Sequence, residues 1–393
     1  MFSKVLVRTI TFSFLISIFS FSIFNAAHAI PAFSAKTKLK CIACHSAWPQ
    51  LNSTGRKFKE LGYRFPGAKA QIKRDVAWNA KVPISFVLKA RPYDKKDSGD
   101  SKVRALHEVE IIVGGAIGKK FSGFFEIEAE DEDTNARGFD VGIPHASFTY
   151  HHSRAANIGF AWGGISVFDP YESFVGSRRL TRGRNSIIDK SFGGADNDGK
   201  LSTSRQSVGL YGRINKNLFY SAAISGVADD SEGVNANTLY ARLVYDFTPN
   251  WSAGLLSVSG TCETSAANCA TDRDYSRVGI DTQFSFRNYR FNAAWLNAKD
   301  DNVGNTNEDE NSAWYIQGYY IFKQNNRPSW VPLVRFDQYE STNGTQEFSE
   351  LTLNVAYYFR SNIKGYIEYW DQTDVPAGVT ADSRFTLQLE VSF

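Results

Sequence analysis

Long stretches of the chain alternate apolar and polar residues with a period of two. In the C-terminal segment, apolar residues stand at the odd positions from Phe385 to Phe393 and polar residues at the even positions from Arg384 to Ser392. Strict alternation of this kind predicts a β-strand with one apolar face and one wet face. Beyond about residue 82 the pattern predicts no amphipathic helix.

Sixteen segments of 10–13 residues fit the strand pattern, the length that a tilted strand needs to cross a bilayer. They are 83–92, 103–114, 121–130, 140–151, 156–167, 203–214, 218–228, 236–247, 251–260, 274–286, 289–299, 312–323, 330–340, 347–359, 362–371 and 381–393. Short turns alternate with long polar loops, as in outer-membrane barrels. We therefore predict an all-β fold, a transmembrane antiparallel β-barrel of about 16 strands spanning 81–393. The alternative is a soluble β-sandwich, whose strands are shorter and whose exposed faces are polar.

The composition agrees with a membrane barrel and excludes two other classes. Hydrophobic residues make up 42% of the chain and charged residues 22%, with a mean hydropathy of −0.32. A membrane protein of many helices would be more apolar, whereas barrel strands average out. With 44 Lys+Arg against 41 Asp+Glu, binding of nucleic acid through bulk charge is also excluded.

The N-terminus reads as a secretory signal peptide. Lys4 and Arg8 precede an apolar run, and Ala27 and Ala29 form a small-x-small cleavage site. We predict that residues 1–29 are removed on export, with an uncleaved anchor as the alternative. Export and the barrel together predict the outer membrane as the location and its lipid as a partner. In this oxidising setting, Cys262 and Cys269 are predicted to form a disulfide within one outer loop.

Residues 41–45 read Cys-Ile-Ala-Cys-His, the attachment signature of a c-type haem. Cys41 and Cys44 would form thioethers to one covalent haem c, and His45 would be the proximal ligand and hold the haem iron. A redox dithiol, a zinc site and a plain disulfide are the alternatives, but no thioredoxin-like context or second Cys/His pair lies nearby.

The residues after this motif predict a small helical haem segment, which we place at 30–80. Gly62 is a natural helix end. Trp48, Phe58 and Tyr63 could cover a porphyrin. The alternative is that they pack in an ordinary apolar core. Arg56 could pair with a haem propionate or be solvated.

The second axial ligand cannot be methionine in the exported chain, because Met1 is the only methionine. Histidine remains, and the candidates are His107, His145, His151 and His152. Strand parity over 140–151 turns His145 toward the lumen, which makes it the best candidate for the distal position, with a pore-lining role as the alternative. Parity over 103–114 places His107 on the outward face.

Parity also predicts an acidic lumen. Glu108 and Glu110 on one strand, and Glu126, Glu128 and Glu130 on the next, face inward. Such a cluster can be a cation-selective pore wall or a path for divalent cations, because carboxylate oxygens suit hard metal ions. The predicted outer loop 168–202 is long enough to fold into the pore as a constriction.

Four features together resemble the fused outer-membrane monohaem cytochrome c–porins of iron-oxidising bacteria. These are the export signal, the single Cys-x-x-Cys-His motif, the sixteen strands and the run Pro49, Leu51, Asn52, Gly55, Arg56, Phe58, Lys59, Gly62 and Tyr63. The resemblance implies that the haem segment plugs the barrel. It also implies electron transfer from extracellular Fe(II), or another reductant, to a periplasmic cytochrome c.

Two other functions stay open at this stage. One is a porin for small or cationic solutes with a structural or sensory haem. The other is a haem peroxidase-like enzyme, which needs an open sixth coordination position on the iron. The sequence contains no recognisable catalytic triad or paired-acid site.

Overall fold

The computed structural model describes residues 32–65, 83–131, 138–171, 173–190, 192, 199–229, 231–233, 237–262, 273–301 and 308–393. The predicted signal peptide, residues 1–29, lies outside the described residues. The predicted boundary at residues 80–81 lies outside them too.

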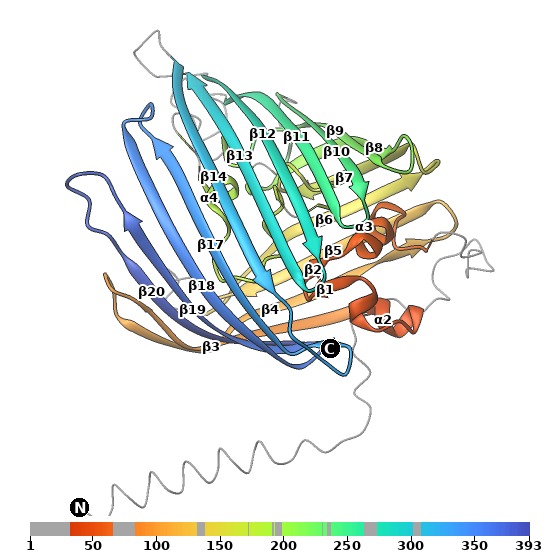
Figure 1. The fold of residues 1–393 in the computed structure, drawn as a ribbon. Helices are drawn as coiled ribbons and strands as arrows, with labels where there is room; N and C mark the ends of the chain where they lie inside the picture. Colours follow the sequence, from red (N-terminus) through yellow and green to blue (C-terminus); the bar gives the residue numbers. More distant parts are fainter. Residues whose placement is uncertain are drawn as a thin grey trace, which may run out of the picture.

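Sixteen antiparallel strands form a closed barrel (Figure 1), as predicted. Each strand pairs with its neighbour along the chain, and the last pairs with the first through partners such as Val391 and Leu88. The strands are β3 (Ile84–Lys96), β4 (Ser101–Ile117), β5 (Phe121–Glu130), β6 (Asp140–His151), β7 (Asn157–Gly163), β8 (Arg205–Arg213), β9 (Leu218–Ser225), β10 (Thr238–Thr248), β11 (Trp251–Cys262), β12 (Arg273–Phe286), β13 (Tyr289–Asp301), β14 (Glu308–Tyr320), β17 (Trp330–Ser341), β18 (Gln346–Arg360), β19 (Ile363–Asp374) and β20 (Ser383–Ser392). Each of the sixteen predicted segments overlaps one of them.

The barrel is apolar outside and polar inside, the reverse of a water-soluble protein. Leu255 and Ile280 are 56% and 51% exposed, whereas Arg242 and Arg277 are 1% and 0% exposed. An outward apolar surface suits lipid, and a closed barrel satisfies its backbone groups without a free edge. A soluble β-sandwich is therefore wrong. Separately, no helix among the described residues is long and apolar enough to cross a membrane.

The two ends of the barrel differ in the length of their connections. Turns such as 118–120 and 361–362 join strands at one end, where the backbone groups of Phe86 and Phe393 also bond each other. The longest connection, 164–204 between β7 and β8, begins and ends at the opposite end. Outer-membrane barrels keep short turns on the periplasmic side. The end of the barrel that holds Phe393 is called the short-turn end below.

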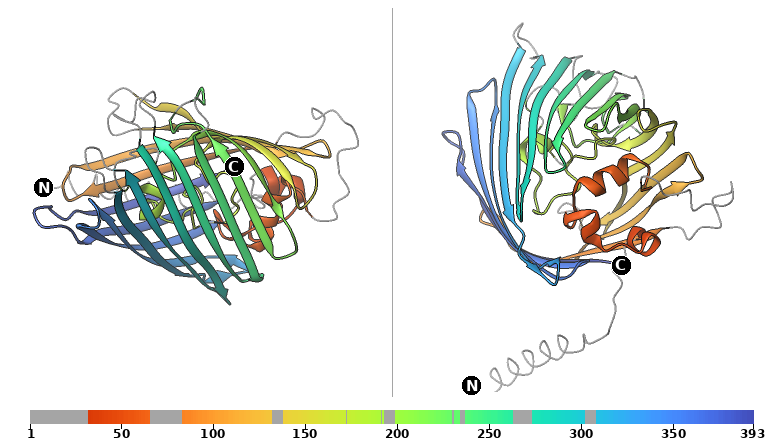
Figure 2. Two further views of the ribbon diagram at one scale, coloured as in Figure 1. Left: turned by 90° about the horizontal axis from the view of Figure 1, so that it is seen from above. Right: turned by 45° about the vertical axis from the view of Figure 1, so that its right-hand side comes forward.

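The connection between β7 and β8, residues 164–204, is called the inner loop below, and its described residues fold into the lumen (Figure 2). It contains the short helix α4 (Ser186–Asp189). Its Phe174 and Ile187 are buried in one apolar cluster with Tyr240 and Leu296 of the barrel wall. This placement agrees with the predicted constriction.

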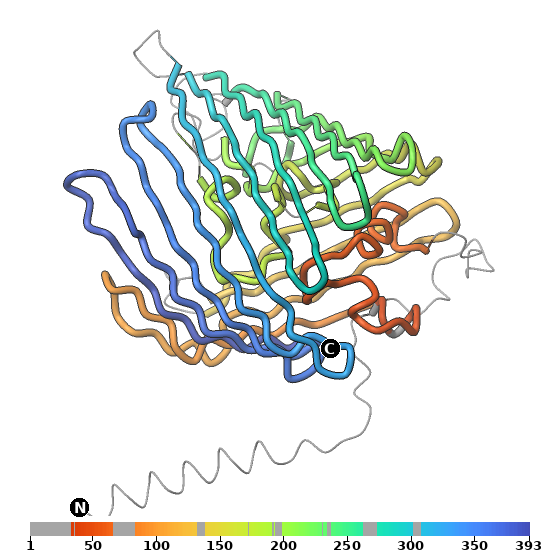
Figure 3. The backbone as a smooth tube through the Cα atoms, viewed as in Figure 1, coloured from red at the N-terminus to blue at the C-terminus, as the bar shows by residue number. Residues whose placement is uncertain are grey.

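Residues 32–65 form a second element in the lumen, which we call the plug, near the short-turn end (Figure 3). It consists of α2 (Ala32–Thr37), the 3-10 turn η1 (Cys41–Ala43), the strands β1 (His45–Ala47) and β2 (Gln50–Leu51), and α3 (Ser53–Glu60). A further small hairpin, β15 (Lys323–Gln324) with β16 (Arg327–Pro328), lies in the connection between β14 and β17.

The plug is tied to both the wall and the inner loop. Tyr358 of β18 donates a hydrogen bond to the carbonyl of Trp48 at 2.7 Å, and Gln50 donates to the carbonyl of Arg178 at 2.8 Å. At the end of α3, Glu60 accepts two hydrogen bonds from Arg213 of β8, at 2.6 and 2.9 Å. Both side chains of this ion pair are buried.

We predict that Glu60→Ala releases the plug, because it leaves the buried guanidinium of Arg213 without its plug partner. Breaking a buried pair from one side costs roughly 3–5 kcal/mol. Trypsin should therefore cut the plug faster in this variant, as followed by mass spectrometry of the protein in detergent. Thr54→Ala, at an exposed position on the same helix, is the control and should leave the rate unchanged. Equal rates for both variants would show that the ion pair does not hold the plug.

Candidate functional site

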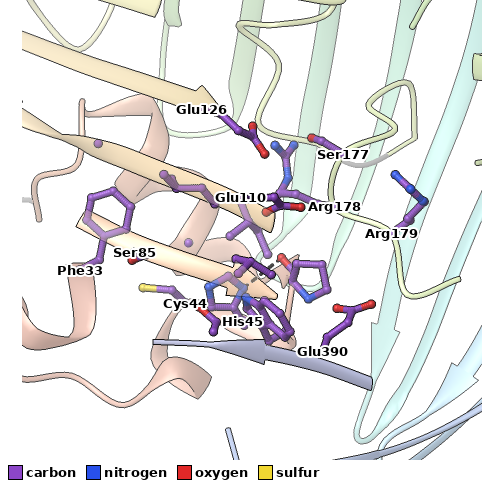
Figure 4. Close-up of a pocket in the computed structure, with 18 of the residues that line it drawn as sticks. Phe33, Cys44, His45, Ser85, Glu110, Glu126, Ser177, Arg178, Arg179 and Glu390 are labelled. Carbon is purple, nitrogen blue, oxygen red and sulfur yellow. Dashed lines mark hydrogen bonds between the residues drawn. The ribbon is translucent and has the colours of Figure 1, made fainter. Parts of the chain in front are cut away.

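Plug, inner loop and barrel wall enclose a cavity of about 290 Å³ (Figure 4). This volume is near the lower end of the range usual for ligand pockets. Cys44 and His45 line the cavity from the plug, Arg178 from the inner loop, and Glu126 and His145 from the wall. The motif at residues 41–45 therefore lies at an enclosed site inside the barrel.

His45 is held in one orientation. Its Nδ1 lies 3.0 Å from the carbonyl oxygen of Pro49, to which it donates a hydrogen bond in the neutral form (Figure 4). This tautomer leaves Nε2 as the nitrogen that can bind a metal. Burial lowers the pKa of His45 to about 4, so the ring is neutral at physiological pH, the form that ligates iron.

The two cysteines occupy different positions. Cys41 is buried in η1, and Cys44 lies at the cavity edge. No disulfide joins them, so the alternative of a plain disulfide is not what the structure has. Burial raises the pKa of both thiols, which keeps them protonated until they react. Cys41 itself is not among the residues that line the cavity.

Helix α3 supports the Cys-x-x-Cys-His segment through Asn52 and Gly55. The Asn52 side-chain oxygen caps the helix by accepting from two backbone N–H groups of its first turn, and its amide donates to the carbonyls of Ile42 and Ala43. A Cβ on Gly55 would lie 2.2 Å from the carbonyl oxygen of Cys44, so only glycine permits this approach. The helix ends at Glu60, and Gly62 follows the C-cap Leu61 with a φ of 63°, which suits a residue without a Cβ.

His145 lines the cavity from β6, as strand parity predicted. Its Nε2 is buried and has no hydrogen-bond partner among the described residues. An unsatisfied buried nitrogen costs free energy, so a ligand that used it would remove this cost. His151 differs, because its ring nitrogens lie 2.7 and 2.9 Å from Ser122 Oγ and Asn157 Oδ1. His152 is exposed.

Three of the four residues predicted to pack against a haem do line the cavity, namely Trp48, Phe58 and Tyr63. Arg56 does not, and for this residue the expectation needs correction. Its guanidinium lies 4.9 Å from the ring centroid of Tyr171, because α3 turns this side chain toward the inner loop.

Other basic residues do reach the cavity. Lys59 lines it from α3, and Arg178, Arg179 and Arg182 line it from the inner loop. The position of these arginines against the plug depends on the path of the loop through the lumen, which no local sequence pattern predicts.

Two further predictions have different outcomes. His107 does not face outward, because it is 1% exposed and contacts Glu130 and Asp131. The pairing of β3 with β4 shifts register on both sides of Arg91, and such a bulge reverses which side chains of a strand face inward.

The predicted disulfide between Cys262 and Cys269 stays a prediction. Cys262 ends β11, but Cys269 lies outside the described residues.

Comparison with known proteins supports the fold. No protein-family model and no curated protein matches the sequence. Among solved structures, OmpF of Salmonella typhi in complex with daunomycin superposes with a TM-score of 0.57 at 14% identity, covering 80% of this chain and 98% of that one. A loop-deletion mutant of OmpT from Vibrio cholerae gives 0.55 at 12% identity, covering 80% and 99%.

A third structure, the outer-membrane channel DcaP of Acinetobacter baumannii, gives a TM-score of 0.53 at 14% identity and covers 81% of this chain and 100% of that one. At these identities the likeness concerns the fold alone. The chain therefore has the fold of an outer-membrane porin, a 16-strand antiparallel barrel, with the plug and the inner loop inside it.

The buried, neutral state of His45 gives a prediction about pH. Between pH 6.5 and about 4 the unfolded plug binds a proton at this ring and the folded plug does not, so acid destabilises the plug. In protein that carries Cys41→Ser and Cys44→Ser, resistance of the plug to protease should fall over this range. The His45 contribution is on the order of 3 kcal/mol.

Adding His45→Gln to this protein should remove that part of the pH dependence, whereas adding His152→Gln should not. An unchanged pH profile in the His45→Gln protein would contradict the buried neutral ring.

Proposed function

We propose that the protein is an outer-membrane electron-transfer protein that carries one covalent haem c inside its barrel. It would move electrons from an extracellular donor, Fe(II) or another reductant, to a periplasmic cytochrome c. We also propose membership of the cytochrome c–porin family that the sequence resembles. The observation that carries the proposal is that His45 of the haem motif and His145 of the wall line one enclosed cavity.

The cavity offers three of the four donors that a haem c with two histidine ligands would use, and the fourth, Cys41, lies buried in η1, three residues before Cys44. Cys44 and His45 stand at its edge, and His145 offers the buried Nε2 that has no partner among the described residues. Two histidine ligands would suit an iron that transfers electrons rather than one that binds a substrate. A haem held there would supply reversible one-electron oxidation and reduction.

The surroundings of the cavity suit the rest of a porphyrin. Phe58 packs edge-on against Phe33, and Tyr63 stacks on Phe33 with ring centroids 4.8 Å apart. This aromatic group provides an apolar face and excludes water. Lys59 and Arg178 bring positive charge to the same cavity and could pair with propionates.

The position inside the barrel matters for electron transfer. The apolar band of an outer membrane is about 25 Å tall, so a redox group in the periplasm alone would be far from an outside donor. A redox group within the lumen lies between the two sides. The plug lies near the short-turn end. A donor that comes from the long-loop end would therefore reach the cavity past the inner loop and the acidic wall.

A solute porin is the second candidate, because the fold is that of porins and the inner loop enters the lumen as a constriction. The haem would then be structural or sensory. Against an open channel stands the packing of the lumen, where plug residues Ala47 and Trp48 join one apolar cluster with Leu180 of the inner loop and Tyr358 of the wall.

Absorption spectroscopy of the purified protein tests the main proposal. We expect a low-spin c-type spectrum in the folded protein, haem that stays attached to the chain after denaturation, and prompt reduction when Fe(II) is added without oxygen. Cys41→Ser with Cys44→Ser should abolish covalent haem while the barrel still folds. His145→Ala should convert the low-spin spectrum to a high-spin one, and His152→Ala is the matched control.

Several outcomes would separate the candidates. Absence of haem from protein exported with the haem-attachment machinery would overturn the proposal. A haem that dithionite reduces and Fe(II) does not would remove iron as donor. Steady solute conductance through planar bilayers, together with a redox-silent haem, would favour the porin. A high-spin spectrum in the unmodified protein would favour a peroxidase-like enzyme.

A further inference from the structure

A histidine and two glutamates meet in the lumen on the outer side of the cavity. Ligand atoms of His107, Glu108 and Glu130 all lie within 4.8 Å of one another. His107 and Glu108 come from β4, and Glu130 ends β5, the strand paired with it. Since β4 runs from the long-loop end to the short-turn end, this group lies further out than Glu110, which lines the cavity.

The His107 ring is aimed into the group and lacks a satisfied partner there. Its side chain is 1% exposed, and its Nε2 makes no hydrogen bond among the described residues. The nitrogen nevertheless lies 3.0 Å from Glu130 Oε1 and 3.9 Å from Glu108 Oε2. The distance from Nε2 to Glu130 is that of a hydrogen bond, but the orientation of the two groups is not.

The other ring nitrogen explains which form the imidazole takes. Nδ1 is in close contact with the carboxylate of Asp131 and donates its proton there. In the neutral ring, Nε2 then presents a lone pair to the carboxylates of Glu108 and Glu130. Lone pairs that face one another are unfavourable unless a proton or a metal ion lies between them, and the contact of Nε2 with Glu130 lacks the geometry of a hydrogen bond. A carboxylate that accepts from Nδ1 while Nε2 binds metal is a common arrangement around metal-bound histidine.

The charge around the group also favours a cation. Glu110 and Glu128 form a second such group with Glu108. Lys89 lies 2.5 and 2.6 Å from Glu108 and Glu110, and Arg104 lies 3.4 Å from Asp131. These five carboxylates outnumber Lys89, Arg104 and the nearby Arg91, which interacts electrostatically with Glu108 and Glu130. Glu130, 42% exposed in its side chain, leaves the group open to solvent.

We propose that His107, Glu108 and Glu130 bind a divalent transition-metal ion. One imidazole nitrogen with carboxylate oxygens suits first-row ions such as Mn²⁺, Fe²⁺ or Zn²⁺ better than Ca²⁺, which takes oxygen ligands only. Asp131 positions the ring and Lys89 holds Glu108. Binding does not depend on a haem. Only the consequence that the ion waits on the outer approach to the cavity rests on the proposed function.

Titration with Mn²⁺, followed by the electron paramagnetic resonance signal of free Mn²⁺, tests the site in the full-length protein in detergent. We expect one saturable site that excess Ca²⁺ does not empty. His107→Ala and the isosteric Glu130→Gln should each weaken binding by tenfold or more, as roughly expected for loss of a ligand. His152→Ala, an exposed histidine outside the group, should bind as the unmodified protein does.

The haem-free protein with Cys41→Ser and Cys44→Ser should bind Mn²⁺ equally well, so failure of the haem proposal and failure of this one are distinguishable. The proposal is overturned if no stoichiometric binding occurs. It is also overturned if Ca²⁺ displaces Mn²⁺ and both His107→Ala and Glu130→Gln bind Mn²⁺ normally. That result would mean that the acidic wall binds divalent cations nonspecifically. Thermal unfolding of the Glu130→Gln variant at the temperature of the unmodified protein would show that its barrel is intact.

Discussion

A strand that crosses lipid in a closed barrel turns every second side chain into the lumen, and in this protein many of those side chains are charged. Removed from bulk water, each charge needs a partner. Arg242 shows the consequence, because its fully buried guanidinium pairs with Asp281 of the wall and with Asp169 of the inner loop, at 2.6 and 2.9 Å. The demand for partners therefore draws a 41-residue connection, residues 164–204, into the barrel instead of leaving it outside.

The plug is held by the same requirement. Arg213, buried near the short-turn end, pairs with Glu60 of the plug and with Asp246 of β10. Lys59 donates to carbonyls of the inner loop, and Arg56 lies over the ring of Tyr171 in that loop. The loop and the plug thus support each other. The barrel by itself would be open to water. The site between the loop and the plug is shielded from solvent because these two elements fill the lumen around it.

The residues that follow the haem motif pack helix α3 against the turn η1. Asn52 caps α3 and binds the carbonyls of η1, Gly55 allows contact with Cys44, and Pro49 accepts from His45. Each of these residues acts on the position or orientation of the Cys-x-x-Cys-His segment. Such contacts are local, so a sequence motif can carry them without reference to the barrel.

Local rules determined most of what could be read from the sequence. The sixteen strands and the lumenal face that includes Glu126 and His145 follow from a periodicity of two residues. The end of α3 before Gly62 follows from the ease with which glycine adopts a positive φ. Tertiary structure decided the rest. A bulge in the pairing of β3 with β4 turned His107 inward, the path of the inner loop brought Arg178 to the cavity, and α3 pointed Arg56 away from it. These outcomes depend on which segments meet in three dimensions, and no local pattern encodes that.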